Sequence, residues 1–464
     1  MRRVSFMGNL NLKKIEKSIK YIDSWLEINF ADSKFPGMQV AILHGDKVVY
    51  SKALGFADLD NKIKLTTDNV FRIASHSKVF TSTAIMQLFE ADKIGLDDKV
   101  SKYLNWFNSS KDTRVANITI RQLLNHTSGI IRDGVDANYW QLLRDFPATK
   151  ELKDYISDCK LIYDGDEVFK YSNYGYGYLG LVIEAISGLT YHNYVTKNIV
   201  NKLGLKSTWP DLSDEVRDKL VKSYSAERFG RKIKPFIDVH TGSLAPATGF
   251  CSNAEDLCRF FAAHFYGNNQ LLSDYSKRYM QHGYWKSGRD ESYGLGMDDI
   301  KKEGWKISGH GGGFPGSNTD TRFDPKKQLV VSVLINSESA DPGEVVWSIM
   351  DIIDTFQQAN PSKNADITRF EGRFFSFEQE VNDVVAAGSK LFLVNPISWS
   401  ELGSARTLLV KDKSTLKIDK ASGFGSVGED IRYMFDKKGN AKSISRAGYK
   451  MLAYDEAKKS GWLD

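Results

Sequence analysis

Four consecutive residues, Ser75-His76-Ser77-Lys78, place a hydroxyl three positions before an amine at the start of an apolar-periodic run. Residues at i and i+3 are neighbours on one face of a helix, so the side chains of Ser75 and Lys78 would meet. A serine hydroxyl becomes a good nucleophile when a nearby base takes its proton. Lysine can be that base only if burial or another cation lowers its pKa well below the free value of about 10.4. The pair is a candidate nucleophile with its own activator, although this spacing is also common by chance.

A second group is Tyr171-Ser172-Asn173, in a stretch rich in tyrosine and glycine. We predict a tight loop here, followed by a helix from Leu181 to Ile186. A tyrosine near two ammonium groups could lose its proton below its usual pKa of about 10 and act as a general base. Asn173 could position a substrate carbonyl. The alternative is a tyrosine-rich packing loop, which is the better interpretation if Ser75 is left out of account.

The third group is the glycine-rich segment Gly309–Gly316, directly after a predicted strand around Ile307. Glycines at a strand edge let a ligand approach the backbone closely. Their N–H groups, together with that of Ser75 at a helix start, could form an oxyanion hole. His310 would add a hydrogen-bond donor or a titratable group facing the same cleft. In isolation, a flexible turn is the simpler interpretation of the glycines.

Strands at both ends of the first 360 residues must position these groups. The predicted elements are an amphipathic helix through Leu12, Ile15, Ile19, Ile22 and Leu26, a hairpin of residues 38–43 and 47–50, a helix from Ser75 to about Lys93, strands at 305–308, 317–323 and 329–335, and a helix at 344–356. Residues from about 100 to 290 are predicted to be mostly helices and loops. A sheet closed by segments far apart in the chain follows from this order.

A polar stretch with a proline, residues 357–366, is the predicted domain boundary. Short apolar runs predict strands at 390–394, 407–410, 415–418, 431–435 and 442–445. We therefore predict a catalytic domain at residues 1–360 and a small β domain at residues 365–464.

Composition limits the class of protein. The 464 residues are 41% hydrophobic and 26% charged, with a dispersed net charge of +5, as in a soluble globular protein, and nothing favours nucleic acid as a partner. Three cysteines predict neither a disulfide framework nor a zinc site. No apolar run is long enough to cross a membrane, and the first residues lack the apolar core of a signal peptide, so a cytoplasmic location is expected.

Taken together, the three groups resemble the serine β-lactamase and penicillin-binding protein superfamily, whose motifs S-x-x-K, Y-x-N and K-T-G occur in this order. The chain is most similar to the class C β-lactamase-like branch, which also holds D-aminopeptidases, DD-carboxypeptidases and esterases. Further matches lie at 123–130, 247–256, 293–296 and in the stretch from 309 to 336. The resemblance implies an α+β fold: an antiparallel sheet flanked by helices with an all-α insertion, plus a small C-terminal all-β domain.

The resemblance also implies a role for each residue. Ser75 is the expected nucleophile and Lys78 its activator, while Tyr171 shuttles the proton between serine and leaving group. Asn173 is expected to hold the substrate amide. The N–H groups of Ser75 and Gly313 would form the oxyanion hole. No metal or organic cofactor is expected in this chemistry.

The third motif departs from the family pattern, because His310-Gly311-Gly312 stands where Lys-Thr-Gly is usual. An imidazole with an ordinary pKa of about 6.5 replaces a permanent ammonium, and a hydroxyl donor is lost. Carboxylate recognition here should therefore weaken near neutral pH, which argues against an efficient β-lactamase. Relatives with His-x-Gly at this position are of the D-aminopeptidase or esterase type.

The predicted function is a serine hydrolase that forms a covalent acyl-enzyme on an amide or ester bond. A peptidase or amidase acting on small D-residue peptides is the first hypothesis, and a carboxylesterase with the same site is the second. A penicillin-binding or sensing protein with little turnover is the third, and its mark would be loss of Tyr171 or Lys78. The expected partner is a small molecule or short peptide, and the sequence leaves the oligomeric state open.

Overall fold

The structure is a computed structural model that describes residues 10–229, 233–360, 365–397, 405–421 and 426–463. The described chain divides into two compact units, one formed by residues 35–346 and the other by residues 10–34 together with residues from 347 onward. Each unit is described by itself below. The domain limits 1–360 and 365–464 remain a prediction.

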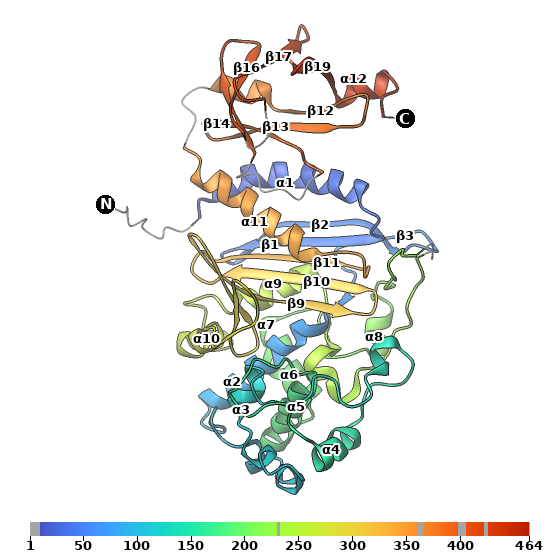
Figure 1. Cartoon of the computed structure of the whole chain (residues 1–464), viewed down its shortest axis with the longest axis vertical. Helices are drawn as coiled ribbons and strands as arrows, with labels where there is room; N and C mark the ends of the chain where they lie inside the picture. The colour runs from blue at the N-terminus through green and yellow to red at the C-terminus, as the bar shows by residue number, and fades with distance from the viewer. Residues whose placement is uncertain (1–9, 230–232, 361–364, 398–404, 422–425, 464) are drawn as a thin grey trace, which may run out of the picture. The chain divides into compact units, whose positions relative to one another are not determined.

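In the described part of the first unit, an antiparallel nine-stranded sheet runs in the order β3-β2-β1-β11-β10-β9-β8-β7-β6. The central pair joins β1 to β11, with Val40 opposite Val333, so segments far apart in the chain lie side by side (Figure 1). This confirms the predicted closure of the sheet. The strands are β1 Gly37–His44, β2 Lys47–Asp58, β3 Ile63–Lys64, β6 Trp285–Lys286, β7 Glu291–Tyr293, β8 Asp298–Lys302, β9 Trp305–Phe314, β10 Ser317–Asp324 and β11 Leu329–Ile335.

A helical region follows the first strands in sequence and lies beside the sheet in Figure 1. Its helices are α2 Ser77–Glu90, α3 Ile120–Leu124, α4 Thr149–Asp158, α5 Asn173–Ser187, α6 Tyr191–Val195, α7 Asn201–Leu203, α8 Asp214–Arg217, α9 Ala254–Ala262 and α10 Asp274–Met280. The predicted all-α insertion is confirmed. Two short strands, β4 Phe71–Arg72 and β5 Cys251–Ser252, pair with each other and were not predicted.

Helix α2 is the buried centre of this unit. Its residues from 77 to 86 are all buried. The Phe80 ring stacks on Phe250 and Phe260, with ring centroids 4.2 and 3.7 Å apart. Just before the helix, the buried guanidinium of Arg72 pairs with Asp211 at 2.9 Å. Aromatic packing and this ion pair therefore fix the start of α2 from several sides.

In the second unit, α1 Leu12–Asp32 confirms the predicted amphipathic helix, and the part of α11 Pro342–Gln358 from Trp347 onward belongs here too. The described C-terminal strands form a closed antiparallel barrel of eight strands around a core that includes Leu391, Leu416 and Ile444. The strands are β12 Gly372–Phe375, β13 Val381–Ala387, β14 Lys390–Val394, β15 Arg406–Val410, β16 Thr415–Lys420, β17 Asp430–Phe435, β18 Ala441–Arg446 and β19 Tyr449–Ala453, followed by helix α12 Tyr454–Lys459. All five predicted strands are present, and the barrel confirms the all-β class.

Three predicted boundaries near the motifs were wrong. Helix α2 begins at Ser77 and ends at Glu90, so Ser75 lies in a 3-10 turn, Ala74–His76, that leads into it. Helix α5 begins at Asn173, because the Ser172 hydroxyl accepts the Gly175 N–H at 3.0 Å and caps the helix there. Strand β9 continues through the glycine motif to Phe314, because each of its residues from Ser308 onward pairs with β10.

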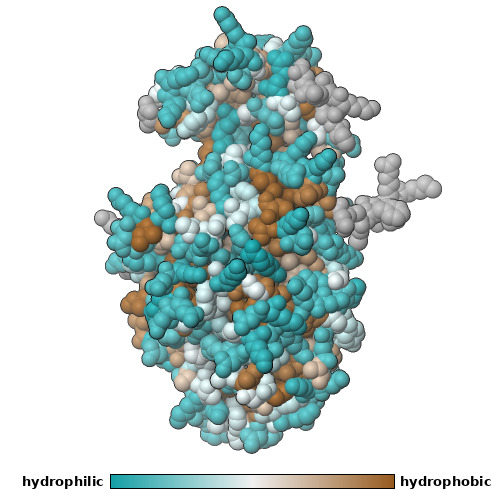
Figure 2. Space-filling model, turned by 180° about the vertical axis from the view of Figure 1, so that it is seen from behind, coloured by the Kyte–Doolittle hydropathy of each residue, from teal (hydrophilic) through white to brown (hydrophobic). Residues whose placement is uncertain are grey.

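Figure 2 shows a face on which hydrophilic residues cover much of the surface and hydrophobic residues gather in separate groups. Along the described chain, no helix has both the length and the apolar character that a membrane span requires.

Candidate active site

Ser75 is held in the turn before α2 by short polar contacts. The Ser77 hydroxyl donates to the Ala74 carbonyl at 2.6 Å and accepts the Phe250 N–H at 3.0 Å. Ala74 adopts a positive φ of 46°, which is strained for a residue with a Cβ. Ser75 itself is only partly buried, so its hydroxyl can be reached from outside while its backbone is fixed.

The Lys78 amine is fully buried and contacts three oxygen atoms. Its Nζ lies 2.7 Å from Asn173 Oδ1, 2.8 Å from the Ala247 carbonyl and 3.1 Å from Ser75 Oγ. Burial lowers the pKa of Lys78 well below its ordinary value. A neutral amine has two N–H donors and one lone pair. In the neutral form of Lys78, Asn173 and Ala247 would take the two N–H groups, because both offer only acceptors, and the lone pair would face the Ser75 hydroxyl.

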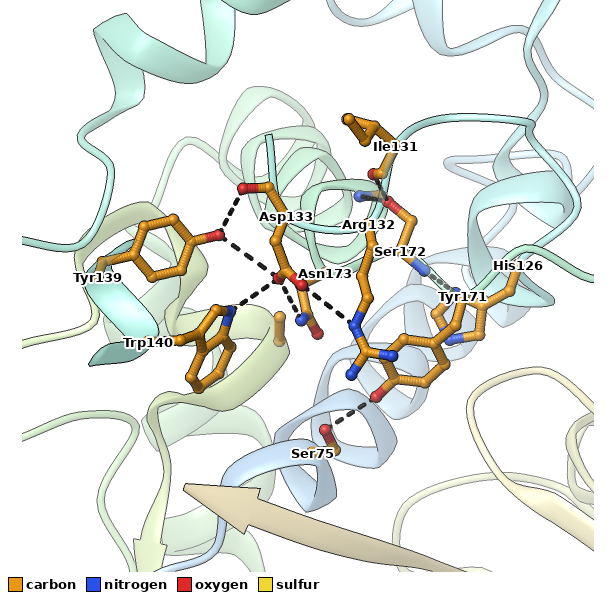
Figure 3. A network of polar contacts seen from close by, with 12 residues as sticks. Ser75, His126, Ile131, Arg132, Asp133, Tyr139, Trp140, Tyr171, Ser172 and Asn173 are labelled. Carbon is orange, nitrogen blue, oxygen red and sulfur yellow. Dashed lines mark hydrogen bonds and ion pairs between the residues drawn. The ribbon is translucent and has the colours of Figure 1, made fainter. Parts of the chain in front are cut away.

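Tyr171 contacts the same hydroxyl, and its ring centroid lies 4.7 Å from Lys78 Nζ. Its OH donates to Ser75 Oγ at 2.8 Å (Figure 3). Burial raises the pKa of Tyr171, although the charge of Arg132 acts in the opposite direction. The expectation of a lowered tyrosine pKa was therefore wrong, because desolvation outweighs the nearby charge. The phenol keeps its proton at neutral pH and is suited to give a proton rather than to take one.

Asp133, which the sequence analysis missed, fixes the orientation of Asn173. Asn173 Nδ2 donates to Asp133 Oδ1 at 2.6 Å, and the indole Nε1 of Trp140 donates to the same oxygen at 3.0 Å (Figure 3). Because its amide nitrogen faces Asp133, Asn173 turns its amide oxygen toward Lys78. Asp133 lies in the loop after the 123–130 match, and no spacing in the sequence pointed to it.

His310 lies on β9 with both ring nitrogens engaged. Its Nε2 is 2.9 Å from the Tyr293 hydroxyl, and its Nδ1 contacts the Gly311 carbonyl. Burial lowers the pKa of His310 to about 4. The imidazole is therefore neutral at neutral pH and supplies no cation at this end of the site.

The register of β9 against β10 sets the direction of the Gly313 N–H group. Strand β8 pairs with β9 only as far as Gly309, so the following residues run on beside the Ala74–His76 turn. Phe314 and Ser317 close a two-residue turn, and Gly313 stands one pair earlier, opposite Asn318. Alternate residues of an antiparallel ladder direct their N–H groups to opposite edges. The N–H of Gly313 therefore points away from β10, toward the edge where Ser75 lies.

Two further histidines support the frame. His76 is buried and its Nε2 contacts the Thr321 hydroxyl of β10 at 3.0 Å, so it is turned toward the sheet. His126 Nδ1 accepts the Ser172 N–H at 3.1 Å, and its ring lies on that of Tyr171 with centroids 4.2 Å apart. His126 thereby stabilises the segment that carries Tyr171. Within the described ranges, no group of three or more histidine, cysteine, aspartate or glutamate side chains is arranged to hold a metal ion.

The antiparallel sheet, the helical region and the serine–lysine pair at the start of a buried helix define a β-lactamase/transpeptidase-like fold. A sequence model of the family described as Beta-lactamase matches residues 22–351. The chain belongs to this family.

Individual curated relatives match only part of the chain, at about 30% identity. Protein flp of Staphylococcus aureus strain MW2 is 31% identical over 198 residues, which is 41% of this chain and 38% of that protein. Beta-lactamase-like protein 2 of Dictyostelium discoideum is 29% identical over 275 residues, or 57% of this chain and 48% of that protein. The chain thus matches less than half the length of either curated relative.

Solved structures share the fold. The octameric penicillin-binding protein homologue from Pyrococcus abyssi has a TM-score of 0.65 at 21% identity, over 94% of this chain and 99% of that one. A D-stereospecific amidohydrolase from Streptomyces has a TM-score of 0.60 at 22% identity, over 73% of this chain and 98% of that one.

The substitution Gly312→Ala tests how closely β9 approaches the chain at Ile73, just before the turn that carries Ser75. A Cβ at this position would lie 2.3 Å from the Ile73 carbonyl oxygen, so one of the two backbones must move. We expect Gly312→Ala to lower kcat/KM by about 10²-fold, as loss of one oxyanion donor does. Gly175→Ala on α5 is the control, since its Cβ would find only ordinary contacts at 3.5 Å or more. Activity equal to wild type in Gly312→Ala would contradict this geometry.

The pH profile tests the protonation state of Lys78. If Lys78 activates Ser75 as the neutral amine, as the sequence analysis expects, kcat/KM for a neutral ester should rise with pH as Lys78 loses its proton. The lowered pKa of Lys78 places this rise well below its ordinary value of 10.5. His310→Asn should keep the same rising limb, which separates Lys78 from the imidazole. A rise centred near pH 10.5 would show that the pKa of Lys78 is not lowered.

Proposed function

We propose that the protein is a serine hydrolase that cleaves amide bonds in small D-residue peptides through a covalent acyl-enzyme on Ser75. The observation that carries the proposal is the position of Ser75 Oγ, 3.1 Å from Lys78 Nζ and 2.8 Å from the Tyr171 hydroxyl. Membership of the Beta-lactamase family supports the hydrolase class. The named activities of a D-stereospecific amidohydrolase and a β-lactamase/D-alanine carboxypeptidase with the same fold suggest the substrate class.

Acylation begins when the neutral Lys78 takes the hydroxyl proton of Ser75 and Oγ attacks the amide carbon. The carbonyl π bond opens to an oxyanion, which the N–H groups of Ser75 and Gly313 stabilise. The carbon–nitrogen bond then breaks as Tyr171 gives its proton to the leaving nitrogen, and the Lys78 ammonium reprotonates the phenolate. The net result is transfer of the serine proton to the departing amine.

Deacylation repeats these steps with water. A water molecule adds to the ester carbon while its proton passes to Lys78, and the same N–H groups hold the second oxyanion. The bond from the acyl carbon to Ser75 Oγ breaks, and Lys78 returns the proton to Oγ. The free acid leaves and the site is restored.

The protonated state of Tyr171 is the reason for placing amides before esters. An amine leaves only after it has been protonated, whereas a phenolate or alkoxide leaving group depends less on an acid. Burial raises the pKa of Tyr171, so the phenol holds a proton at the reacting centre. The neutral His310 argues against efficient β-lactam hydrolysis, since it lacks the charge that binds the lactam carboxylate.

Ser75→Ala tests the nucleophile. The substrates are p-nitrophenyl acetate, D- and L-alanine p-nitroanilide and a chromogenic cephalosporin, and hydrolysis is followed by absorbance. We expect wild-type protein to cleave the ester and the D-anilide, and Ser75→Ala to cleave neither. Retained activity on both substrates would remove Ser75 from the mechanism. Cleavage of esters alone by wild-type protein would favour the carboxylesterase hypothesis.

Tyr171→Phe tests the proton donor. We expect cleavage of the D-anilide to slow by about 10²-fold or more, because the leaving nitrogen loses its acid. The p-nitrophenyl ester should be affected much less, since its leaving group needs no proton. Equal losses on both substrates would instead indicate a structural role for the hydroxyl.

A further inference from the structure

An arginine lies on the ring of the proposed proton donor. The guanidinium carbon of Arg132 is 5.0 Å from the ring centroid of Tyr171, and the two side chains overlap in Figure 3. The Arg132 side chain is 61% exposed, although the tyrosine beneath it is largely covered. A permanent positive charge therefore stands at the open side of the site.

The orientation of Arg132 is fixed at its inner edge. Arg132 Nε contacts Asp133 Oδ2 at 3.1 Å. Asp133 is held in turn by Asn173, by the Trp140 indole and by the Tyr139 hydroxyl, which donates to the Asp133 carbonyl at 2.8 Å. The Asp133 carboxylate thus accepts hydrogen bonds from Asn173 and Trp140 through Oδ1 and contacts Arg132 Nε through Oδ2. Because the contact with Asp133 is made by Nε and the side chain is exposed, the two terminal NH₂ groups of the guanidinium can receive an anion.

The position of Arg132 relative to Tyr171 says which part of a substrate it would meet. In the proposed mechanism the Tyr171 hydroxyl gives its proton to the leaving nitrogen, so the leaving residue lies against this phenol. Arg132 covers the ring of the same tyrosine. A carboxylate carried by the leaving residue would therefore come within reach of the guanidinium.

The third motif supplies no competing charge. Both ring nitrogens of His310 are engaged, and burial lowers the pKa of His310 to about 4. Among the described residues around Ser75, burial also lowers the pKa of Lys78, whereas an arginine stays charged at any working pH. The cation that could bind a substrate carboxylate is thus displaced from β9 to the loop that carries Arg132.

We propose that Arg132 forms an anion subsite for the carboxylate of the leaving residue, so that the preferred substrates are peptides or esters whose leaving portion ends in a free carboxylate. This inference rests on the proposed function, because it places the leaving portion by the role of Tyr171. It adds a specificity that the three motifs do not contain.

The test compares two substrates that differ in one charge: 3-carboxyphenyl acetate and 3-carbamoylphenyl acetate. The quantity measured is the ratio of their kcat/KM values, because intrinsic reactivity cancels when variants are compared with wild type. We expect Arg132→Met to lower the ratio by about 10- to 100-fold, the usual effect of losing a charged hydrogen bond. Arg132→Lys should give a ratio between those of wild type and Arg132→Met, since lysine keeps the charge but lacks the paired N–H donors of the guanidinium. Arg132→Glu should reverse the preference.

Lys150→Met is the control for loss of one surface charge. Lys150 lies on α4 in the same unit, and its exposed amine pairs with Asp154. The variant should keep the wild-type ratio. An unchanged ratio in Arg132→Met, or equal losses for both substrates, would overturn the proposed subsite. If wild-type protein cleaves neither ester in a Ser75-dependent way, the proposed function is contradicted and the subsite with it.

Discussion

The site depends on the burial of one amine. Water would keep a lysine charged, and a charged Lys78 could not take a proton from serine. The fold removes that water by enclosing Nζ between the Asn173 amide oxygen, the Ala247 carbonyl and Ser75 Oγ. Two of these neighbours are oxygen atoms that can only accept hydrogen bonds, so in the proposed mechanism the lone pair of the neutral amine faces the third neighbour, the Ser75 hydroxyl. In the proposed mechanism, serine reactivity is a consequence of this geometry.

Each wall of that enclosure comes from a different part of the chain. Ala247 lies in the π-helical turn Ala245–Gly249, Asn173 starts α5, and Ser75 sits in the turn before α2. The same turn contacts the edge of β9 through glycines that leave room for the Ile73 carbonyl. Aromatic stacking on Phe80 and the ion pair of Arg72 keep these segments together. The proposed chemistry thus depends on packing at positions that never touch a substrate.

The sequence predicted the parts of the site that local spacing and motif order encode. Ser75 and Lys78 are three positions apart, and Tyr171 and Asn173 stand together in the second motif. It could not predict Asp133, because the partners of that carboxylate meet it only in the folded chain. The sequence also could not predict the direction of the Tyr171 pKa shift, because that direction depends on desolvation in the folded chain. The sequence analysis missed the barrel strands β12, β13 and β19, although it predicted the five strands β14 to β18.

The most direct test of this account is the pKa of Lys78 itself. Protein labelled at the lysine ζ positions can be titrated by NMR, with Lys78→Met to identify the resonance. The account predicts that the Lys78 amine titrates well below its ordinary pKa of 10.5. A Lys78 resonance that titrates together with the exposed lysines would mean that the amine is charged at neutral pH, and would contradict the central claim.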